Sequence, residues 1–91
     1  MDCWIGIGQS GTRRVVRLAG RLTSTHVPDL LEACNGSREL DLDLSELLSA
    51  DVAGIDAIRR IRQNGASLLR ASGYIQFQLD SEPSQPAKLN G

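Results

Sequence analysis

A chain of 91 residues has room for one domain, and a domain of this size buries only a modest share of its unfolded surface. Its 10 basic and 11 acidic residues give a formal net charge of -1, so no overall field directs it to nucleic acid or to an anionic membrane. Aromatic residues make up only 3% of the sequence, which argues against a surface for stacking bases.

The two cysteines, Cys3 and Cys34, have neither the density nor the spacing of a disulfide scaffold or a zinc site. We therefore expect reduced thiols and a cytoplasmic location. We also expect no bound metal and no cofactor. The N-terminus is acidic and its apolar stretch is soon broken by glycine, which is unlike a secretory signal. Nowhere do about 18 uncharged apolar residues run together, so we expect no direct insertion into a membrane.

Two short β-type runs, residues 3–7 and 13–19, flank a turn cluster at residues 9–12 and predict an antiparallel hairpin. The following apolar residues recur at helical spacing and share one face: Val27, Leu30, Leu31 and Cys34. Ser24 or Thr25 is predicted to cap this first helix, and Pro28 is tolerated in its first turn.

Residues 39–44 alternate polar and apolar side chains, which predicts a strand with its leucines in the core. Asp41 and Asp43 then lie on the other face, which we expect to be solvated. Residues 45–50 are predicted to be a loop, and Asp51 is predicted to cap a second helix. The buried side of that helix is formed by a set at helical spacing: Gly54, Ile55, Ala57, Ile58 and Ile61.

Residues 67–71 form a further short sheet segment. The alternation within residues 74–80 fits a strand, but Ile75 and Leu79 are also one helical turn apart, and a short helix is favoured. From residue 81 onward the sequence carries two prolines and no periodicity, so residues 1–80 form the predicted domain and residues 81–91 a disordered tail.

The predicted order is strand, strand, helix, strand, helix, strand, helix, which requires parallel crossovers within a mixed sheet. Because Asp41 and Asp43 make one face of the central strand polar, helices cannot cover both faces. The sequence therefore predicts an α/β fold with a mixed β-sheet of about four strands and helices packed on one face.

Three segments carry a family resemblance. Residues 15–23 resemble a strand that ends in a Gly-x-Leu turn ahead of a helix. Leu42-Asp43-Leu44-Ser45, followed by Asp51-Val52-Ala53-Gly54-Ile55, resembles an Asp-Leu-Ser strand end and then Asp-Ser-Ser-Gly-Leu opening a helix. By order and spacing, residues 13–80 resemble the STAS (sulfate transporter and anti-sigma factor antagonist) family, as a short stand-alone bacterial member.

The resemblance implies a non-catalytic protein-binding module of the anti-sigma factor antagonist kind, whose partner is an anti-sigma factor or kinase. The partner-binding residues it implies surround the start of the second helix: Thr23, Ser24, Ser45, Ser49, Asp51, Val52, Ala53, Gly54 and Ile55. Regulated members are phosphorylated on the serine directly after the motif aspartate. Val52 occupies that position here and Ala53 the next, so neither can accept phosphate. Constitutive binding is favoured, with Thr23, Ser24, Ser45 and Ser49 as the other candidate hydroxyls.

Two other functions remain open. Similar short STAS proteins act as accessory subunits of ABC-type transporters, with the transporter ATPase as partner. A metal- or nucleotide-binding enzyme would use Asp41, Asp43 and Asp51, but no nearby His, Lys or third carboxylate suggests a nucleophile or a completed set of metal ligands. Asp51 is equally explained as a plain helix cap, and His26 as an exposed polar residue.

Self-association is a further expectation. The segment after residue 73 is shorter than the final helix of most STAS domains, so apolar surface is left uncovered and a homodimer is predicted. Cys3 and Trp4 lie on what could be a sheet edge, where packing and self-association are both open. The arginine-rich stretches are interspersed with acidic residues, so we expect no nucleic-acid binding.

Overall fold

The computed structural model describes residues 3–36 and 39–80. The predicted tail, residues 81–91, lies outside the described residues and remains a prediction. The elements follow in the order β1 (Cys3–Ser10), β2 (Arg13–Leu22), a 3-10 turn η1 (Ser24–His26), α1 (Val27–Cys34), β3 (Leu40–Ala50), α2 (Val52–Gln63), β4 (Ser67–Leu69) and α3 (Gly73–Asp80). This is the predicted order, and the favoured helix over residues 74–80 is confirmed as α3.

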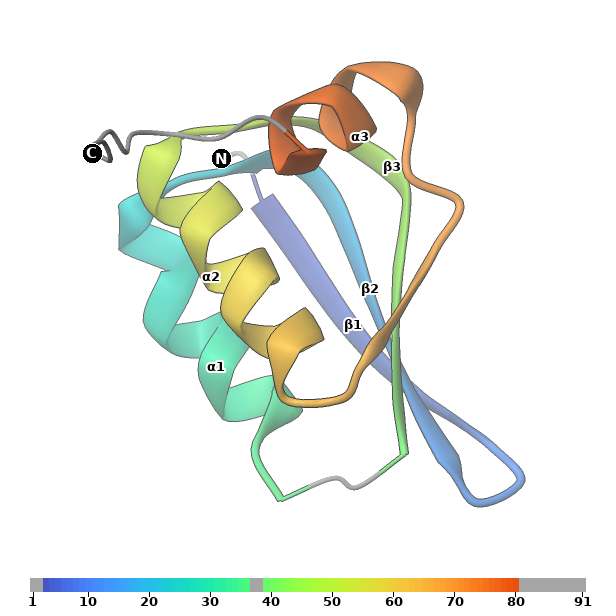
Figure 1. The fold of residues 1–91 in the computed structure, drawn as a ribbon. Coiled ribbons are helices and arrows are strands. Elements are labelled where there is room, and N and C mark those ends of the chain that lie inside the picture. The colour runs from blue at the N-terminus through green and yellow to red at the C-terminus, as the bar shows by residue number, and fades with distance from the viewer. Residues whose placement is uncertain (1–2, 37–38, 81–91) are drawn as a thin grey trace, which may run out of the picture.

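The four strands form one mixed sheet in the order β1-β2-β3-β4 (Figure 1). β1 and β2 form the predicted antiparallel hairpin, which turns over Gly11 and Thr12. The φ of Gly11 is +64°, as a two-residue hairpin with glycine at its first turn position requires. β3 runs parallel to both β2 and β4, with α1 and α2 as the crossovers. The predicted mixed α/β sheet is confirmed.

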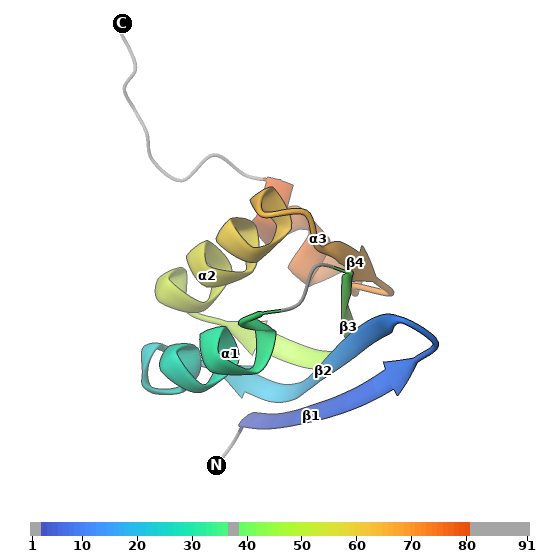
Figure 2. The ribbon, with the colours of Figure 1, turned by 90° about the horizontal axis from the view of Figure 1, so that it is seen from below.

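All three helices lie on the same side of the sheet (Figure 2). Between helices and sheet lies one hydrophobic cluster, made of Val16, Leu18 and Leu22 from β2, Leu30 and Ala33 from α1, Leu40, Leu42, Leu44 and Leu47 from β3, Ile55, Ala57, Ile58 and Ile61 from α2, and Ile75 and Leu79 from α3. The alternating leucines of β3 and the isoleucines of α2 therefore occupy the positions that their spacing predicts.

The predicted loop at residues 45–50 is wrong, because β3 continues to Ala50. Arg17 of β2 pairs with Asp43 of β3, and Ala19 of β2 pairs with Glu46 of β3. Over this stretch β3 therefore contains one residue more than β2. This bulge places Ser45 and Glu46 at the surface in succession and returns Leu47 to the core. The strict alternation that identifies a strand is broken there, so the sequence pattern ends too early.

Two expectations for α1 are also wrong. Neither Ser24 nor Thr25 caps the helix, because the chain enters through η1 and the cap residue is His26, which makes no side-chain capping bond. Leu31 is exposed and Ala33 is buried in its place, so the buried stripe of α1 is rotated towards Ala33 relative to the face that the spacing predicts. Pro28 does lie in the first turn.

Within residues 3–36 and 39–80, no helix combines the length and the apolar character needed to cross a membrane.

Candidate functional site

The start of α2 is fixed by the side chain and backbone of Asp51. Its Oδ1 accepts a hydrogen bond from the Gly54 N–H at 2.8 Å, the predicted helix cap. Its Oδ2 accepts from the backbone N–H of Ser24 at 3.0 Å, and its own N–H donates to the Leu22 carbonyl at 3.0 Å. One residue therefore joins the end of β2, the start of η1 and the start of α2.

Gly54 lets α2 approach β2 more closely than any other residue would. A Cβ built on Gly54 would lie 2.9 Å from the carbonyl oxygen of Leu22 and 3.0 Å from its Cγ. The first distance is shorter than real Cβ atoms show and the second is very tight, so the backbone of Leu22 and its side chain would both have to move. Glycine is thus required here by packing, and its position is buried.

Thr23 and His26 close the turn that leads into α1. The Thr23 hydroxyl and His26 Nδ1 share a hydrogen bond of 3.1 Å. Both side chains are half-buried, whereas Ser24 between them is exposed. The Asp51 carboxylate reaches the backbone of Ser24, so this turn and the start of α2 form one polar network.

The structure brings together most of the predicted binding residues. Ser24, Asp51, Val52 and Ala53 are exposed around the start of α2, with Thr23 and Ser49 half-buried beside them. We call these six residues the α2-start surface. Its most prominent member is Val52, the first residue of α2, whose side chain is 82% exposed.

Three predicted residues do not belong to this surface. Gly54 and Ile55 are buried in the core beneath it. Ser45 is exposed, but it lies six residues before Asp51 along an extended strand, which at about 3.3 Å per residue separates the two by about 20 Å. Leu48 of β3 is 71% exposed and is not among the predicted binding residues, because the sequence pattern predicts a loop at its position.

Asp41 and Asp43 lie on the sheet face opposite the helices, and both are engaged by basic side chains. Arg13 donates to Asp41 through Nη2 at 2.7 Å and Nε at 3.1 Å, and this pairing lowers the pKa of Asp41. Asp43 accepts a hydrogen bond from the Ser45 N–H at 3.0 Å and has Arg17 Nε at 3.5 Å. The hydrogen bond from Ser45 is the main cause that lowers the pKa of Asp43. The charges of Arg17 and Arg70 lower it further.

The expectation of a solvated face is wrong for Asp43, which is only 4% exposed and lies against Arg17 of β2. Asp51 lies eight residues further along the chain, beyond the end of β3. Across the part of the chain that the structure describes, no three His, Cys, Asp or Glu side chains gather as a metal site would need.

Both cysteines are thiols. Burial raises the pKa of Cys34 to about 11, so this half-buried group stays protonated at neutral pH. Burial also raises the pKa of Cys3, which lies on β1. Neither cysteine has the lowered pKa that reactive thiols show.

No protein-family model and no curated protein matches the chain. Solved structures do. The STAS domain of an antisigma-factor antagonist from Rhodobacter sphaeroides superposes with a TM-score of 0.58 at 20% identity, over 79% of this chain and 94% of that one. A protein named Mglu matches with a TM-score of 0.56 at 22% identity, over 70% of this chain but only 18% of its own.

An uncharacterized protein from Shewanella loihica with a SpoIIAA-like fold matches at 18% identity over 82% of this chain and 70% of its own, with a TM-score of 0.48. That score is too low to carry weight. The likeness to the Rhodobacter sphaeroides domain spans nearly all of that chain and confirms, at the level of the fold, the resemblance drawn from the sequence. The protein has a STAS-like fold.

Proposed function

We propose that this STAS-like domain is a non-catalytic protein-binding module of the anti-sigma factor antagonist kind, and that it binds its partner through the α2-start surface. The observation that carries the proposal is Val52, an apolar side chain 82% exposed at the first position of a helix. Asp51 fixes the backbone on either side of it through three hydrogen bonds. A backbone segment that is already held in place loses little freedom on binding, which favours affinity.

The composition of the α2-start surface fits a protein partner. Val52 and Ala53 supply its apolar centre, and Ser24, Thr23 and Asp51 supply polar groups around them. An apolar centre within a polar rim is the usual anatomy of a protein interface. Gly54 and Ile55 support this surface from below, since both are buried.

We further propose that binding is not gated by phosphorylation of the usual site. Val52 has no hydroxyl, and Ala53 has none either. Ser24 is exposed, and its backbone N–H is bonded to Asp51, so this serine lies beside the start of α2. Incubation with an anti-sigma kinase, followed by mass spectrometry, should leave the chain unmodified. Val52→Ser serves as the positive control, and high-yield modification of Thr23, Ser24, Ser45 or Ser49 in the parent chain would contradict the proposal.

The absence of catalysis is supported by how the carboxylates are used. Asp41 and Asp43 are held by arginines or backbone on one face of the sheet, while both oxygens of Asp51 accept backbone N–H groups. These groups therefore serve the fold. Thermal-shift measurements with nucleotides and Mg²⁺ should give no stabilisation, and a clear upward shift would favour the enzyme hypothesis.

The partner we propose is an anti-sigma factor, since the superposed Rhodobacter sphaeroides domain is an antisigma-factor antagonist. The two thiols support a reducing, cytoplasmic setting. Isolation of a transporter ATPase with the chain, in place of an anti-sigma factor, would identify it as a transporter subunit instead.

The decisive experiment is Val52→Asp in a pull-down of the partner. Binding should fall at least about tenfold, because a charge replaces the central apolar contact. The fold should be unaffected, since the side chain is exposed. Tyr74→Asp, at an exposed position on α3, is the matched control and should bind normally. Full binding by the folded Val52→Asp variant would refute the proposed surface.

A further inference from the structure

β1 is an edge strand with an unusually unprotected sequence. Among the described strands it pairs only with β2, so one side of its backbone is unpaired. Its residues Cys3–Ser10 include no charged side chain and no proline. Natural edge strands generally carry one or the other, or are covered, because an exposed backbone ladder accepts a further strand.

The turn geometry identifies which backbone groups point outward. Ser10 pairs with Arg13 across a two-residue turn, and such a closing pair is hydrogen-bonded. Because bonded and non-bonded pairs alternate along a regular ladder, the N–H and C=O groups of Gly6 and Gly8 also face β2. Those of Ile5, Ile7 and Gln9 then face the open edge.

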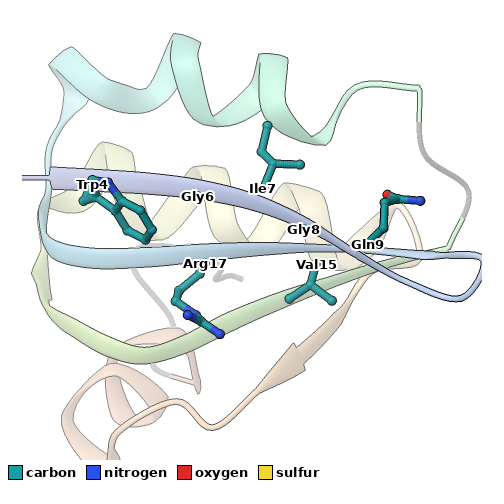
Figure 3. A pocket seen from close by; sticks show the side chains of 7 residues that line it. All are labelled: Trp4, Gly6, Ile7, Gly8, Gln9, Val15 and Arg17. Carbon is teal, nitrogen blue, oxygen red and sulfur yellow. The ribbon is translucent and has the colours of Figure 1, made fainter.

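β1 carries one exposed apolar side chain on each face of the sheet, Ile7 on one and Trp4 on the other (Figure 3). On the helix side, Ile7 is 60% exposed. On the opposite side, Trp4 is 58% exposed and its ring lies over Gly6, where a built Cβ would be 2.5 Å from ring atom Cη2. Over Gly8 a Cβ would meet nothing within 4 Å. A hollow of about 450 Å³ results, lined by Trp4, Gly6, Ile7, Gly8, Gln9, Val15 and Arg17.

We propose that a second copy of this chain adds its own β1 antiparallel to this edge, with the two-fold axis at Ile7. The two sheets then continue as one. Ile7 meets Ile7 of the partner subunit on the helix side. On the face away from the helices, Gly6 lies opposite Gly8 of the partner subunit. The Trp4 ring, which covers Gly6, then extends over the open space at Gly8 of the partner subunit.

The occupant is a second copy because the strand is complementary to itself. In this register Gly6, which the Trp4 ring covers, lies opposite Gly8 of the partner subunit, which has open space above it. The two-fold axis repeats this match on the other half of the interface. Two uncharged strands also meet without like-charge repulsion, and nothing charged on β1 selects an oppositely charged partner. The pairing uses neither the start of α2 nor Val52, so it is independent of the proposed function.

The dimer should be concentration-dependent. One strand pair with two apolar side chains per copy buries less than the roughly 1,200–2,000 Å² of a standard stable interface. Sedimentation across a wide range of protein concentration should therefore show a monomer converting to a dimer. Trp4 is the one tryptophan of the chain, so its emission should shift to shorter wavelength along the same curve. A monomer at every concentration would overturn the proposal.

Two substitutions should abolish the dimer and leave the monomer folded. Ile7→Lys places a charge on the edge at an exposed position. Gly8→Val fills the open space needed by Trp4 of the partner subunit, while the monomer accommodates it because Gly8 has no positive φ and no close neighbour. Leu48→Lys, at a position on β3 that is exposed to a similar degree, is the control and should dimerise. A dimer that survives both edge variants would refute the edge as the interface.

Disulfide trapping tests the register. In a Cys3→Ser background, Ile7→Cys should cross-link with itself on oxidation, because directly opposed bonded residues have Cα atoms about 5.5 Å apart. Gln9→Cys should not, since it lies opposite Ile5 of the partner subunit. Cross-linking of Gln9→Cys and not of Ile7→Cys would exclude the register centred on Ile7. Val52→Asp should dimerise normally, which separates this result from the test of the α2-start surface.

Discussion

α1 and α2 begin at the same end of the sheet, yet their starts are built in different ways (Figure 1). α2 is capped by the side chain of Asp51. α1 is entered through η1, and its cap residue His26 makes no side-chain capping bond. The carboxylate of Asp51 also holds the N–H of Ser24, so the start of η1 relies on a group supplied by the other crossover.

The first residue of each helix is a valine, and the two valines lie in opposite surroundings. Val27 packs against the core, while Val52 is exposed. The same side chain at the same helix position therefore serves packing in α1 and is left available in α2. The start of α2, which the carboxylate of Asp51 caps, is also the one that presents an exposed apolar group, as the proposed binding surface requires.

Substitutions at the third residue of each helix should show the largest difference in the free energy of unfolding between the two helix starts. Gly54→Val should destabilise the fold by about 3 kcal/mol, because the new side chain collides with the Leu22 carbonyl and Cγ. Asp29→Val, at the corresponding exposed position of α1, should change stability by no more than about 0.5 kcal/mol. Urea unfolding of both variants measures this, and equal losses would show that the close approach is not special to α2.

Substitutions of the two valines should show the next largest difference in stability. Val27→Asp should cost about 2 kcal/mol, since it places a carboxylate against the core cluster. Val52→Asp should change stability by less than about 0.5 kcal/mol. Thermal unfolding followed by circular dichroism compares them. A strongly destabilised Val52→Asp would mean that Val52 contributes to packing and is unsuitable as a binding probe.

Substitutions of the two cap residues should show the smallest difference in stability. Asp51→Ala should cost about 1.5 kcal/mol, because both the Gly54 and the Ser24 N–H groups lose their acceptor. His26→Ala, which removes the bond to Thr23, should cost only about 0.5 kcal/mol. Urea unfolding at neutral pH provides the values. The asymmetry between the helix starts would be disproved if His26→Ala were the more damaging change.

The sequence was sufficient for the features that depend on local periodicity. The leucines of β3, the isoleucines of α2 and the cap at Asp51 all follow from short-range spacing. It failed where a distant segment decides the outcome. The bulge after Asp43 arises in the pairing with β2, and the N–H of Ser24 is bonded by a residue 27 positions away.

The candidate site was predictable in part for the same reason. The resemblance at residues 51–55 located the start of α2, but it could not tell which side chains point outward. Exposure there is set by the approach of α2 to Leu22, which buries Gly54 and Ile55 and leaves Val52 at the surface. Asp43 is likewise paired with Arg17 of the neighbouring strand, a contact that local spacing does not reveal.

The double role of Asp51 has a consequence for motion as well as for stability. The amide protons of Ser24 and Gly54 are thirty residues apart in the chain, yet both are bonded to one carboxylate. Any fluctuation that swings this side chain away exposes both amides to water at once. Their hydrogen exchange should therefore be correlated, which would link the motions of the two helix starts at this end of the sheet.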